Sequence, residues 1–314
     1  MILTGGLGTR LHPLTLDLPK ALVPILNRPL IAYGIDLLAA AGIREIVVVV
    51  ARTDDRTGPA AIAAAPAGVR VSVGVQPEPR GSGDAVVCAG AALDGRRVVV
   101  LAVDTLLRGS LAPHVQAFMR GGVDAWLVLH PTDRPTEMGI ALLDGERVID
   151  IEEKPEHPRS NLALCGVWML APSAIERLRT APVINARGES DLTRTVGAML
   201  ADGYAIGGRE LEGYWFDVGT IRSLLTTQAI LLSEADRAER TDLIIERSDI
   251  AEPVLIGPGT LIEDATLGPN VVVGAGCVLR HVRLRDALVA PGATVEHFED
   301  AHVVVTATGA VGRA

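Results

Sequence analysis

Apolar and polar positions in residues 1–103 alternate between short apolar runs and stretches with helical spacing. Residues 46–51 and 98–103 are unbroken apolar runs, typical of strands buried on both faces of a parallel sheet. Residues 30–41 have helical spacing and stop at Gly42, a residue suited to a helix C-cap. This order predicts a doubly wound α/β sheet, whose ligands bind at the carboxyl ends of the strands. Further strands are expected over 1–4 and 69–75, and a helix over 84–92.

The mixed pattern continues over residues 104–232. Expected helices cover 111–119, 192–202 and 221–232, expected strands cover 125–129 and 162–170, and a hairpin covers 139–150 with its turn at Asp144-Gly145. Residues 1–232 are therefore predicted to form one domain. A polar and highly charged segment then begins, and we expect a linker over 233–252.

The pattern changes from residue 253 onward. Apolar residues recur there at near-six-residue spacing, with Gly and Pro close to them, at Ile256, Ile262, Leu267, Val273, Leu279, Leu284, Val289 and Val295. A hexapeptide period with Gly or Pro at the corners is typical of a β-helical solenoid. Only about three coils fit into residues 253–314, so we expect the solenoid to pack on its neighbouring domain or on another subunit. The chain is accordingly expected to form a homo-oligomer.

Composition and charge exclude several classes of protein. The chain has 314 residues, a net charge of −9, 48% apolar and 21% charged residues, which is the composition of a globular protein. An acidic chain without a basic block is a poor nucleic-acid ligand, and no apolar run reaches the ~18 residues of a membrane span. The three cysteines are far apart and the chain does not begin with a signal-peptide pattern, so we expect a reducing, cytoplasmic location without a zinc or disulfide framework.

Lysine is almost absent from the chain. Of 29 basic residues, two are Lys (Lys20 and Lys154) and the remaining 27 (29 − 2) are Arg. Arg replaces Lys freely on a solvated surface, but not where a compact ammonium on a flexible stem is needed. The two lysines are therefore candidate functional residues.

The strongest motif is a glycine-rich turn directly after the first expected strand. It comprises Gly5, Gly6, Leu7, Gly8, Thr9 and Arg10, and is followed by Pro13, Thr15, Pro19 and Lys20. Such a turn lets backbone N–H groups approach phosphates closely. Arg10 and Lys20 add the charge that a polyphosphate requires.

This string resembles the signature of the sugar-phosphate nucleotidylyltransferases, also called nucleotide-sugar pyrophosphorylases. The likeness extends over essentially the whole chain and is greatest to long-form glucose-1-phosphate thymidylyltransferases. It implies the mixed, Rossmann-like sheet of nucleotide-diphospho-sugar transferases, with a short C-terminal left-handed β-helix of hexapeptide repeats. It also implies that an NTP, dTTP for preference, and a sugar 1-phosphate, glucose 1-phosphate for preference, form an NDP-sugar and pyrophosphate with Mg²⁺.

The resemblance also implies functions for individual residues. For the nucleotide they are Gly5, Gly6, Gly8, Thr9, Arg10, Lys20, Gln76, Gly81 and Asp104, with Arg10, Lys20 and Lys154 as the catalytic cations. Gln76 resembles the residue that reads a pyrimidine, since its amide can both accept from and donate to the imide edge. For the sugar phosphate they are Gly139, Glu153, Lys154, Gly166 and Trp215, and for the metal they are Asp104 and Asp217.

Two departures from the family pattern leave alternatives open. Val103 stands before the metal-binding Asp104 where the family usually has Gly, and Ser82-Gly83-Asp84 follows Gly81 where most thymidylyltransferases have Leu-Ala. The same chemistry with UTP and glucose 1-phosphate, or with GTP and mannose 1-phosphate, is one alternative. A catalytically impaired paralogue that binds a nucleotide-sugar and regulates a partner is another. An acyltransferase in the tail is not favoured, because it has few coils and no evident catalytic His.

Overall fold

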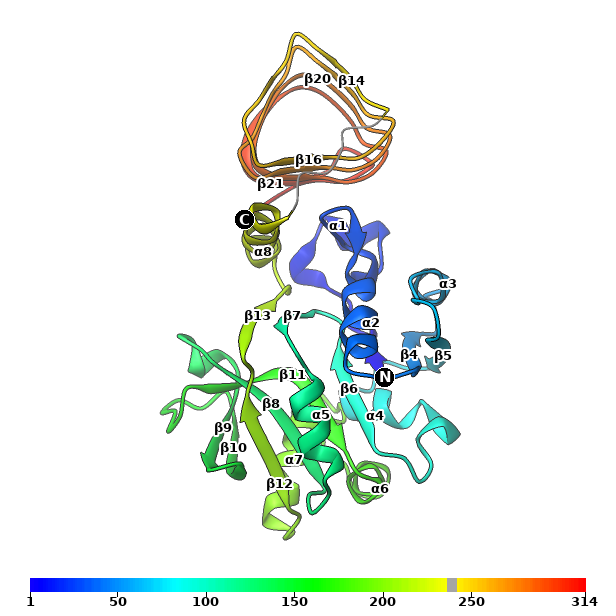
Figure 1. Cartoon of the computed structure of the whole chain (residues 1–314), viewed down its shortest axis with the longest axis vertical. Coiled ribbons are helices and arrows are strands. Elements are labelled where there is room, and N and C mark those ends of the chain that lie inside the picture. Colours follow the sequence, from blue (N-terminus) through cyan, green and yellow to red (C-terminus); the bar gives the residue numbers. More distant parts are fainter. Residues whose placement is uncertain (236–241) are drawn as a thin grey trace. The chain divides into compact units, whose positions relative to one another are not determined.

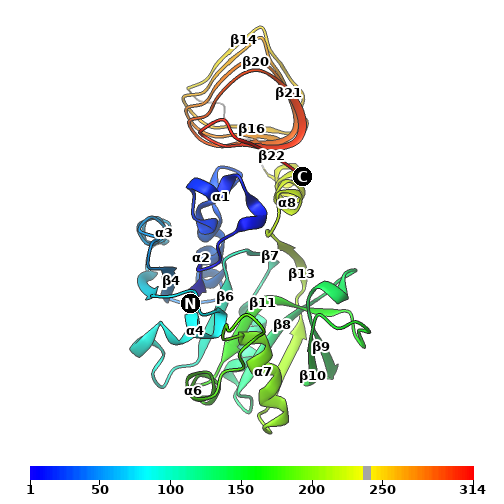
Figure 2. The ribbon, with the colours of Figure 1, turned by 180° about the vertical axis from the view of Figure 1, so that it is seen from behind.

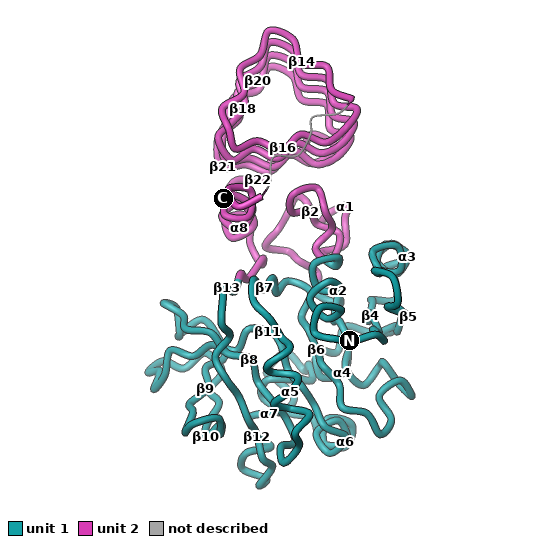
Figure 3. Tube along the Cα trace, in the orientation of Figure 1, with its two compact units in different colours: residues 1–6, 31–215 teal, residues 7–30, 216–314 magenta. Residues whose placement is uncertain are grey.

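The computed structural model describes residues 1–235 and 242–314 (Figure 1). The chain divides into two compact units, coloured separately in Figure 3. Unit 1 consists of Met1–Gly6 and Ile31–Trp215, and unit 2 of Leu7–Leu30 and Phe216–Ala314. These limits differ from the single domain expected over 1–232, because residues 7–30 and the last predicted helix pack with the C-terminal coils. No helix in the described part of the chain has the length and apolar character needed to cross a membrane.

Unit 1 is built on a nine-stranded mixed sheet. In spatial order its strands are β5 (Arg70–Gln76), β4 (Glu45–Ala51), β1 (Ile2–Leu3), β6 (Val98–Ala102), β11 (Leu162–Leu170), β8 (Ala125–Pro131), β12 (Ile206–Glu210), β10 (Arg147–Glu153) and β9 (Gly139–Asp144). The first four strands are parallel to one another, whereas β11 runs antiparallel to β6 and β8. The expected doubly wound arrangement is therefore present, with an antiparallel part added to it.

The short strand β1 is buried on both of its faces. Ile2 is paired with Val48 and Leu101, and Leu3 belongs to the apolar cluster shared with the helices of one face. On the other face, Ile2 and Leu101 contact Gly34, where an added Cβ would lie 3.3 and 3.0 Å from their side chains. A strand with helices on both faces needs apolar residues at every position, which explains its continuous apolar sequence.

The helices that pack on this sheet are α2 (Leu30–Ala40), α3 (Thr57–Ala63), α4 (Ser82–Val87), α5 (Ala112–Met119), α6 (Pro172–Thr180) and α7 (Leu192–Ala201). Figure 2 shows α4, α6 and α7 together, and their buried residues form one cluster with the sheet. The helix expected over 84–92 ends at Val87 and is followed by a 3-10 turn (Gly90–Leu93) that begins with Gly90 at φ +58°. The sequence did not predict α3 or α6, which are short and contain or begin with Pro.

Unit 2 contains the rest of the glycine-rich turn, a long helix and the C-terminal coils. Its first segments are two 3-10 turns (Thr9–Leu11 and Lys20–Leu22), α1 (Leu14–Asp17), β2 (Pro24–Ile25) and β3 (Arg28–Pro29), and its long helix is α8 (Ile221–Glu234). Two further strands, β7 (Thr105–Gly109) of unit 1 and β13 (Gly213–Asp217) at the end of unit 1, pair as a separate two-stranded sheet. In α8, Thr220 and Ser223 form a capping box that fixes the helix start.

The coils of unit 2 stack as parallel strands with the triangular outline seen in Figure 1. Ile244, Leu261, Val278 and Thr294 align in register, so successive coils are offset by 17, 17 and 16 residues (261 − 244, 278 − 261, 294 − 278). Their strands are β14 (Ile244–Glu246), β15 (Asp249–Ile250), β16 (Val254–Ile256), β17 (Leu261–Glu263), β18 (Thr266–Leu267), β19 (Val271–Val273), β20 (Val278–Val289), β21 (Thr294–Val305) and the antiparallel β22 (Val311–Arg313). Three strict hexapeptides would give 18 residues per coil. The observed coils are one or two residues shorter, which explains why the apolar spacing in the sequence falls to five in places.

The coils begin earlier than the sequence predicts. The pairing of β14 and β15 with β17 and β18 places residues 244–250 in the first coil, although they were expected to form a linker. The sequence signal was missed because this coil lacks regular Gly and Pro corners and leaves Ile244 56% exposed. Residues 236–241 of the expected linker lie outside the described residues.

One corner of the coils is formed by residues in left-handed backbone conformation. Arg247, Asp264, His281 and His297 occupy equivalent positions, with φ between +47° and +52°. The guanidinium of Arg247 donates to both carboxylate oxygens of Asp264, at 2.7 and 2.9 Å, and the two imidazoles are stacked with centroids 4.8 Å apart. Both histidines are exposed.

The last strand of unit 2 packs tightly against the segment after the glycine-rich turn. A Cβ at Gly312 would lie 2.5 Å from Pro13 and 2.7 Å from Ile221. Because both atoms belong to packed residues, we expect Gly312→Ala to lower the free energy of unfolding by about 1–3 kcal/mol, the usual cost of overpacking. Denaturant titration measures this change. Ala307→Ser, at an exposed position, is the control, and an unchanged midpoint for Gly312→Ala would show that β22 is not held against Pro13.

Candidate active site

Three of the predicted site residues of unit 1 lie where parallel strands end. Gly5 follows β1, Gln76 is the last residue of β5, and Asp104 follows β6 by two positions. Because these strands are parallel, their carboxyl ends form one edge of the sheet, which is where ligands bind in such folds. The contact is direct for two of the residues, since a Cβ at Gly5 would lie 2.9 Å from Oε1 of Gln76.

The Gln76 side chain is buried, with 5% of its surface exposed, and its amide nitrogen is engaged twice. Nε2 donates to the carbonyl oxygen of Gly81 at 3.0 Å and to Oδ2 of Asp84 at 2.8 Å. An amide NH₂ has two hydrogens, so both are used within the protein. The sequence suggested that this amide both donates to and accepts from a base; in this structure only its oxygen is available for recognition.

The segment after Gly81 is shaped by Ser190. A Cβ at Gly81 (φ +96°) would lie 2.4 Å from the carbonyl oxygen of Ser190, and one at Gly83 would lie 2.3 Å from its Oγ. The N–H of Gly83 donates to the same carbonyl at 2.9 Å. The unusual Ser82-Gly83-Asp84 sequence is therefore explained: Gly83 accommodates Ser190, and Asp84 binds Gln76.

Val103, the other departure from the family pattern, continues the strand before it. Its N–H donates to the carbonyl oxygen of Leu3 at 3.1 Å, and its side chain is 6% exposed. The added side chain is thus accommodated in the protein interior.

The glycine-rich turn continues into unit 2, where Gly8 contacts Lys20. Gly8 has φ +63°, and a Cβ there would lie 3.0 Å from Thr15 and 3.2 Å from the Lys20 stem. Thr15 Oγ1 donates to the carbonyl oxygen of Gly8 at 2.7 Å. Lys20 is 9% exposed, and such burial is unusual for a lysine. A Cβ at Gly6, by contrast, would meet no protein atom of the described chain within 4 Å.

Arg10 and Asp217 approach the same glycine in unit 2. A Cβ at Gly219 would lie 2.9 Å from a guanidinium nitrogen of Arg10 and 3.1 Å from Oδ1 of Asp217. Gly219 is buried, and the helix cap at Thr220 follows it directly. Sequence reasoning assigned functions to Arg10 and Asp217 but missed Gly219. Its only signal in the sequence was its position two residues after Asp217.

Glu153 and Lys154 form the end of the hairpin that carries Gly139. Glu153 is paired with Gly139, and a Cβ at that glycine would lie 2.8 Å from Glu153 Oε2. Lys154 is exposed, has φ +51°, and its N–H donates to the carbonyl oxygen of Met138 at 3.0 Å. Positive φ at a non-glycine residue costs energy and is concentrated at functional sites.

The pKa of the Glu153 carboxyl is raised. Burial is the main cause and the nearby Asp191 adds to it, while Lys154 and Arg194 oppose the shift. The protein therefore holds this carboxylate in an environment that disfavours its charge. Such environments are typical of binding and catalytic sites.

Gly166 and Trp215 occupy two further positions in unit 1. Gly166 has φ +70° in an irregular part of β11, and a Cβ there would lie 2.2 Å from Thr105 Oγ1, a hydroxyl that donates to Cys165 O at 2.9 Å. The Trp215 ring lies edge-on to His130 with centroids 6.3 Å apart. Its indole Nε1 is buried without a hydrogen-bond partner in the described structure, so it can donate to a ligand.

The described residues contain no cluster of three or more His, Cys, Asp or Glu side chains suited to a metal ion. Of the two predicted metal ligands, Asp104 lies in unit 1 and Asp217 in unit 2. Their assignment to one metal stays a prediction.

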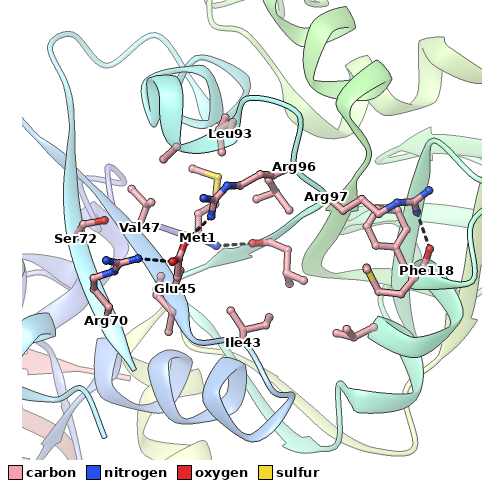
Figure 4. A pocket seen from close by; sticks show the side chains of 16 residues that line it. Met1, Ile43, Glu45, Val47, Arg70, Ser72, Leu93, Arg96, Arg97 and Phe118 are labelled. Atoms are coloured by element: carbon pink, nitrogen blue, oxygen red, sulfur yellow. Dashed lines mark hydrogen bonds and ion pairs between the residues drawn. The ribbon is translucent and has the colours of Figure 1, made fainter. Parts of the chain in front are cut away.

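A cavity of about 500 Å³ opens at the amino ends of the strands (Figure 4). Its rim carries Arg70 and Arg96, which both pair with Glu45, and this pairing lowers the pKa of the Glu45 carboxyl. Glu45 and Arg70 begin β4 and β5, whereas the site residues stand at the ends of strands. This cavity is therefore separate from the candidate site.

Comparison with known proteins agrees with the geometry. Residues 1–234 match the nucleotidyl transferase family. The chain is 30% identical over 312 residues to glucose-1-phosphate thymidylyltransferase of Streptomyces griseus (94% of this chain, 88% of the relative). It is 27% identical over 281 residues to a mannose-1-phosphate guanylyltransferase catalytic subunit beta of Drosophila pseudoobscura pseudoobscura (88% and 71%). In fold it resembles UDP-glucose pyrophosphorylase of Acinetobacter baumanii (TM-score 0.66, 24% identity, 75% of this chain and 93% of that one).

A mixed sheet with a glycine-rich turn at its carboxyl edge defines a nucleotide-binding α/β protein of the nucleotidyltransferase type. The chain belongs to the nucleotidyl transferase family, and within it to the sugar-1-phosphate nucleotidyltransferases, the enzymes that make nucleoside diphosphate sugars.

The contact between Gly83 and Ser190 can be tested by a double-mutant cycle. Gly83→Ala should lower the free energy of unfolding by about 1–3 kcal/mol, because its Cβ overlaps Ser190 Oγ. Ser190→Ala alone should raise it by about 1 kcal/mol, since that buried hydroxyl lacks a partner among the described residues. In the double variant the cost of Gly83→Ala should shrink. Additive effects in urea titration would argue against the contact.

Glu153→Gln should stabilise the protein in a pH-dependent way. A carboxyl with a raised pKa costs stability wherever the native state must ionise it, so the advantage of Gln is complete above the native pKa. It declines as pH falls through that pKa and vanishes below the unfolded value. Melting temperatures of both proteins across the acid range measure this difference. A stability gain that is independent of pH would contradict the assigned burial of the charge.

Proposed function

We propose that this enzyme is a glucose-1-phosphate thymidylyltransferase. A phosphate oxygen of glucose 1-phosphate attacks the α-phosphorus of dTTP, the bond from that phosphorus to the α,β-bridging oxygen breaks, and pyrophosphate leaves. The observation that carries the nucleotide part is the Gln76 oxygen facing Gly5 at the carboxyl edge of the sheet. The name of the Streptomyces griseus relative supports the choice of thymidine and glucose.

The glycine-rich turn is proposed to bind the triphosphate. Gly5, Gly6, Gly8 and Thr9 would supply the backbone that wraps it, and the open space at Gly6 supports close approach of a phosphate. Arg10 would stabilise charge on the α-phosphate and the departing pyrophosphate. Lys20, a buried lysine whose stem packs against Gly8, would hold the phosphates nearby. Gln76 and Gly81 would form the base site.

The sugar phosphate is proposed to bind at the hairpin end. Glu153 would accept hydrogen bonds from sugar hydroxyls, which offset the burial of its charge. Gly139 leaves room for the sugar beside that carboxylate, Lys154 would bind the 1-phosphate, and Gly166 and Trp215 would complete the site. The free indole N–H of Trp215 supports a contact with a sugar oxygen.

Asp104 and Asp217 are proposed to hold Mg²⁺. Their chemistry fits the ion, because Mg²⁺ binds through one or two carboxylates, with substrate phosphates and water as further ligands. The absence of a Cβ at Gly219 leaves space beside Oδ1 of Asp217, which supports the fit. When bound, the ion reduces the repulsion between the two anionic phosphates. The attacking phosphate is already a nucleophile, so the residues of the chain act by positioning and by neutralising charge.

Three alternatives remain. UTP with glucose 1-phosphate and GTP with mannose 1-phosphate use the same chemistry, and the names of the Acinetobacter and Drosophila proteins keep both in view. The third is a regulatory, catalytically impaired paralogue. The accommodated side chain of Val103 and the charged residues beside Gly219 support catalysis instead.

We also propose that the tail is a left-handed β-helix of hexapeptide repeats that serves assembly into a homo-oligomer. A cytoplasmic location belongs to the same proposal. The stacked parallel coils and their apolar core support the β-helix.

A matrix of pyrophosphate release tests the function. Five NTPs (dTTP, UTP, GTP, CTP and ATP) are combined with glucose, mannose and galactose 1-phosphates, with and without Mg²⁺. We expect the highest kcat/KM for dTTP with glucose 1-phosphate, and a loss of turnover without Mg²⁺. Lys154→Ala should raise the sugar-phosphate KM, and Arg159→Ala, on the exposed surface just beyond, should not. No turnover in any combination would favour the regulatory paralogue.

A further inference from the structure

The orientation of the Gln76 amide is set by two acceptors from one short segment. The carbonyl oxygen of Gly81 and Oδ2 of Asp84 both accept from Nε2, at 3.0 and 2.8 Å. A carbonyl and a carboxylate are acceptors only. The opposite orientation would place the amide oxygen against the Gly81 carbonyl and the Asp84 carboxylate. The repulsion from the charged carboxylate would be larger than that from the carbonyl.

The consequence is that Gln76 presents an oxygen toward the glycine-rich turn. Oε1 lies on the side of Gly5, 2.9 Å from the position of a Cβ there. A carbonyl oxygen at this place accepts a hydrogen bond and cannot donate one. Where it faces the ring nitrogen of a base, it accepts a hydrogen bond from a ring N–H and repels an unprotonated ring nitrogen.

We infer that Asp84 is a positioning residue that locks the Gln76 amide and so restricts the enzyme to nucleotides whose base carries a ring N–H beside a carbonyl. Thymine, uracil and guanine have such an edge, whereas cytosine and adenine present a bare ring nitrogen. The inference rests on the proposed function, in which Gln76 faces the base. It adds a residue outside the predicted site and a rule for the class of NTP.

A purely structural role for Asp84 is the competing explanation. Asp84 lies in the first turn of α4, where a carboxylate stabilises a helix start, and its Oδ2 also lies 3.7 Å from Cys88 Sγ. However, this helix has no side-chain cap, and the shortest contact of the carboxylate is with Gln76. A structural role predicts a change in stability with unchanged base preference.

Four variants separate these explanations. Asp84→Ala and Asp84→Leu both remove the acceptor, and Leu retains bulk should the Ala variant fail to fold. Asp84→Asn keeps an acceptor oxygen, and Cys88→Ala removes the neighbour of Asp84 without touching Gln76. For each, kcat and KM are measured with dTTP, UTP, GTP and CTP, together with the melting temperature and the KM for glucose 1-phosphate.

We expect Asp84→Ala and Asp84→Leu to reduce the preference for dTTP over CTP, as a ratio of kcat/KM, by about tenfold, the effect of about one oriented hydrogen bond. The change should appear mainly in the NTP KM, and the KM for glucose 1-phosphate should stay constant. Asp84→Asn and Cys88→Ala should keep the ratio within about threefold of the wild type.

Several results would overturn the inference. A folded Asp84→Ala or Asp84→Leu protein with an unchanged ratio would reduce Asp84 to a structural residue, and the proposed function would stand. If the wild type shows no turnover, calorimetric binding of dTTP and CTP to the same variants decides the matter separately. Equal affinity of the wild type for the two nucleotides, or binding of neither, would refute the inference.

Discussion

The approach of the Gln76 side chain to Gly5 is the constraint on which the nucleotide end of unit 1 depends. The parallel strands β1 and β5 end at this edge with β4 between them, and a Cβ at Gly5 would lie 2.9 Å from Oε1 of Gln76. The amide nitrogen is fixed on the other side by Gly81 and Asp84. Gly81 is in turn confined by Ser190, which begins the chain's path into α7. Gly5, Gln76 and the loop that contains Ser190 thus share one packing arrangement.

A glycine that leaves room for a neighbouring polar side chain also occurs at the other candidate positions. Gly139 leaves space for the buried carboxylate of Glu153, Gly166 for Thr105, and Gly219 for the side chains of Arg10 and Asp217. In each case the missing Cβ lets a polar side chain lie close to the backbone. At Glu153 the polar group is a buried carboxylate, whose pKa is raised mainly by that burial. Enzymes that transfer phosphoryl-type groups depend on this kind of fixed electrostatic environment.

The coils of unit 2 contact segments that come much earlier in the chain. Gly312 in the last strand packs against Pro13 and Ile221, and Asn27 donates to Val273 O in the coils at 2.9 Å. The buried Gln228 of α8 donates to Ala287 O at 3.1 Å. Residues just after the glycine-rich turn therefore share one packed body with the solenoid.

The sequence by itself determined the strand–helix order, the residues of the glycine-rich turn and the presence of stacked coils, because apolar periodicity and Gly placement are local properties. The sequence did not predict α3 and α6, and it placed the first coil too late. It also predicted domains that are continuous in the chain, whereas each compact unit combines distant segments. These features depend on contacts between segments far apart in the sequence. Only the tertiary structure decided that Gln76 donates both amide hydrogens to groups of the protein, and that the missing Cβ of Gly83 leaves room for Ser190. Neither could be read from the chain, since residues 83 and 190 meet only after the sheet has brought their segments together.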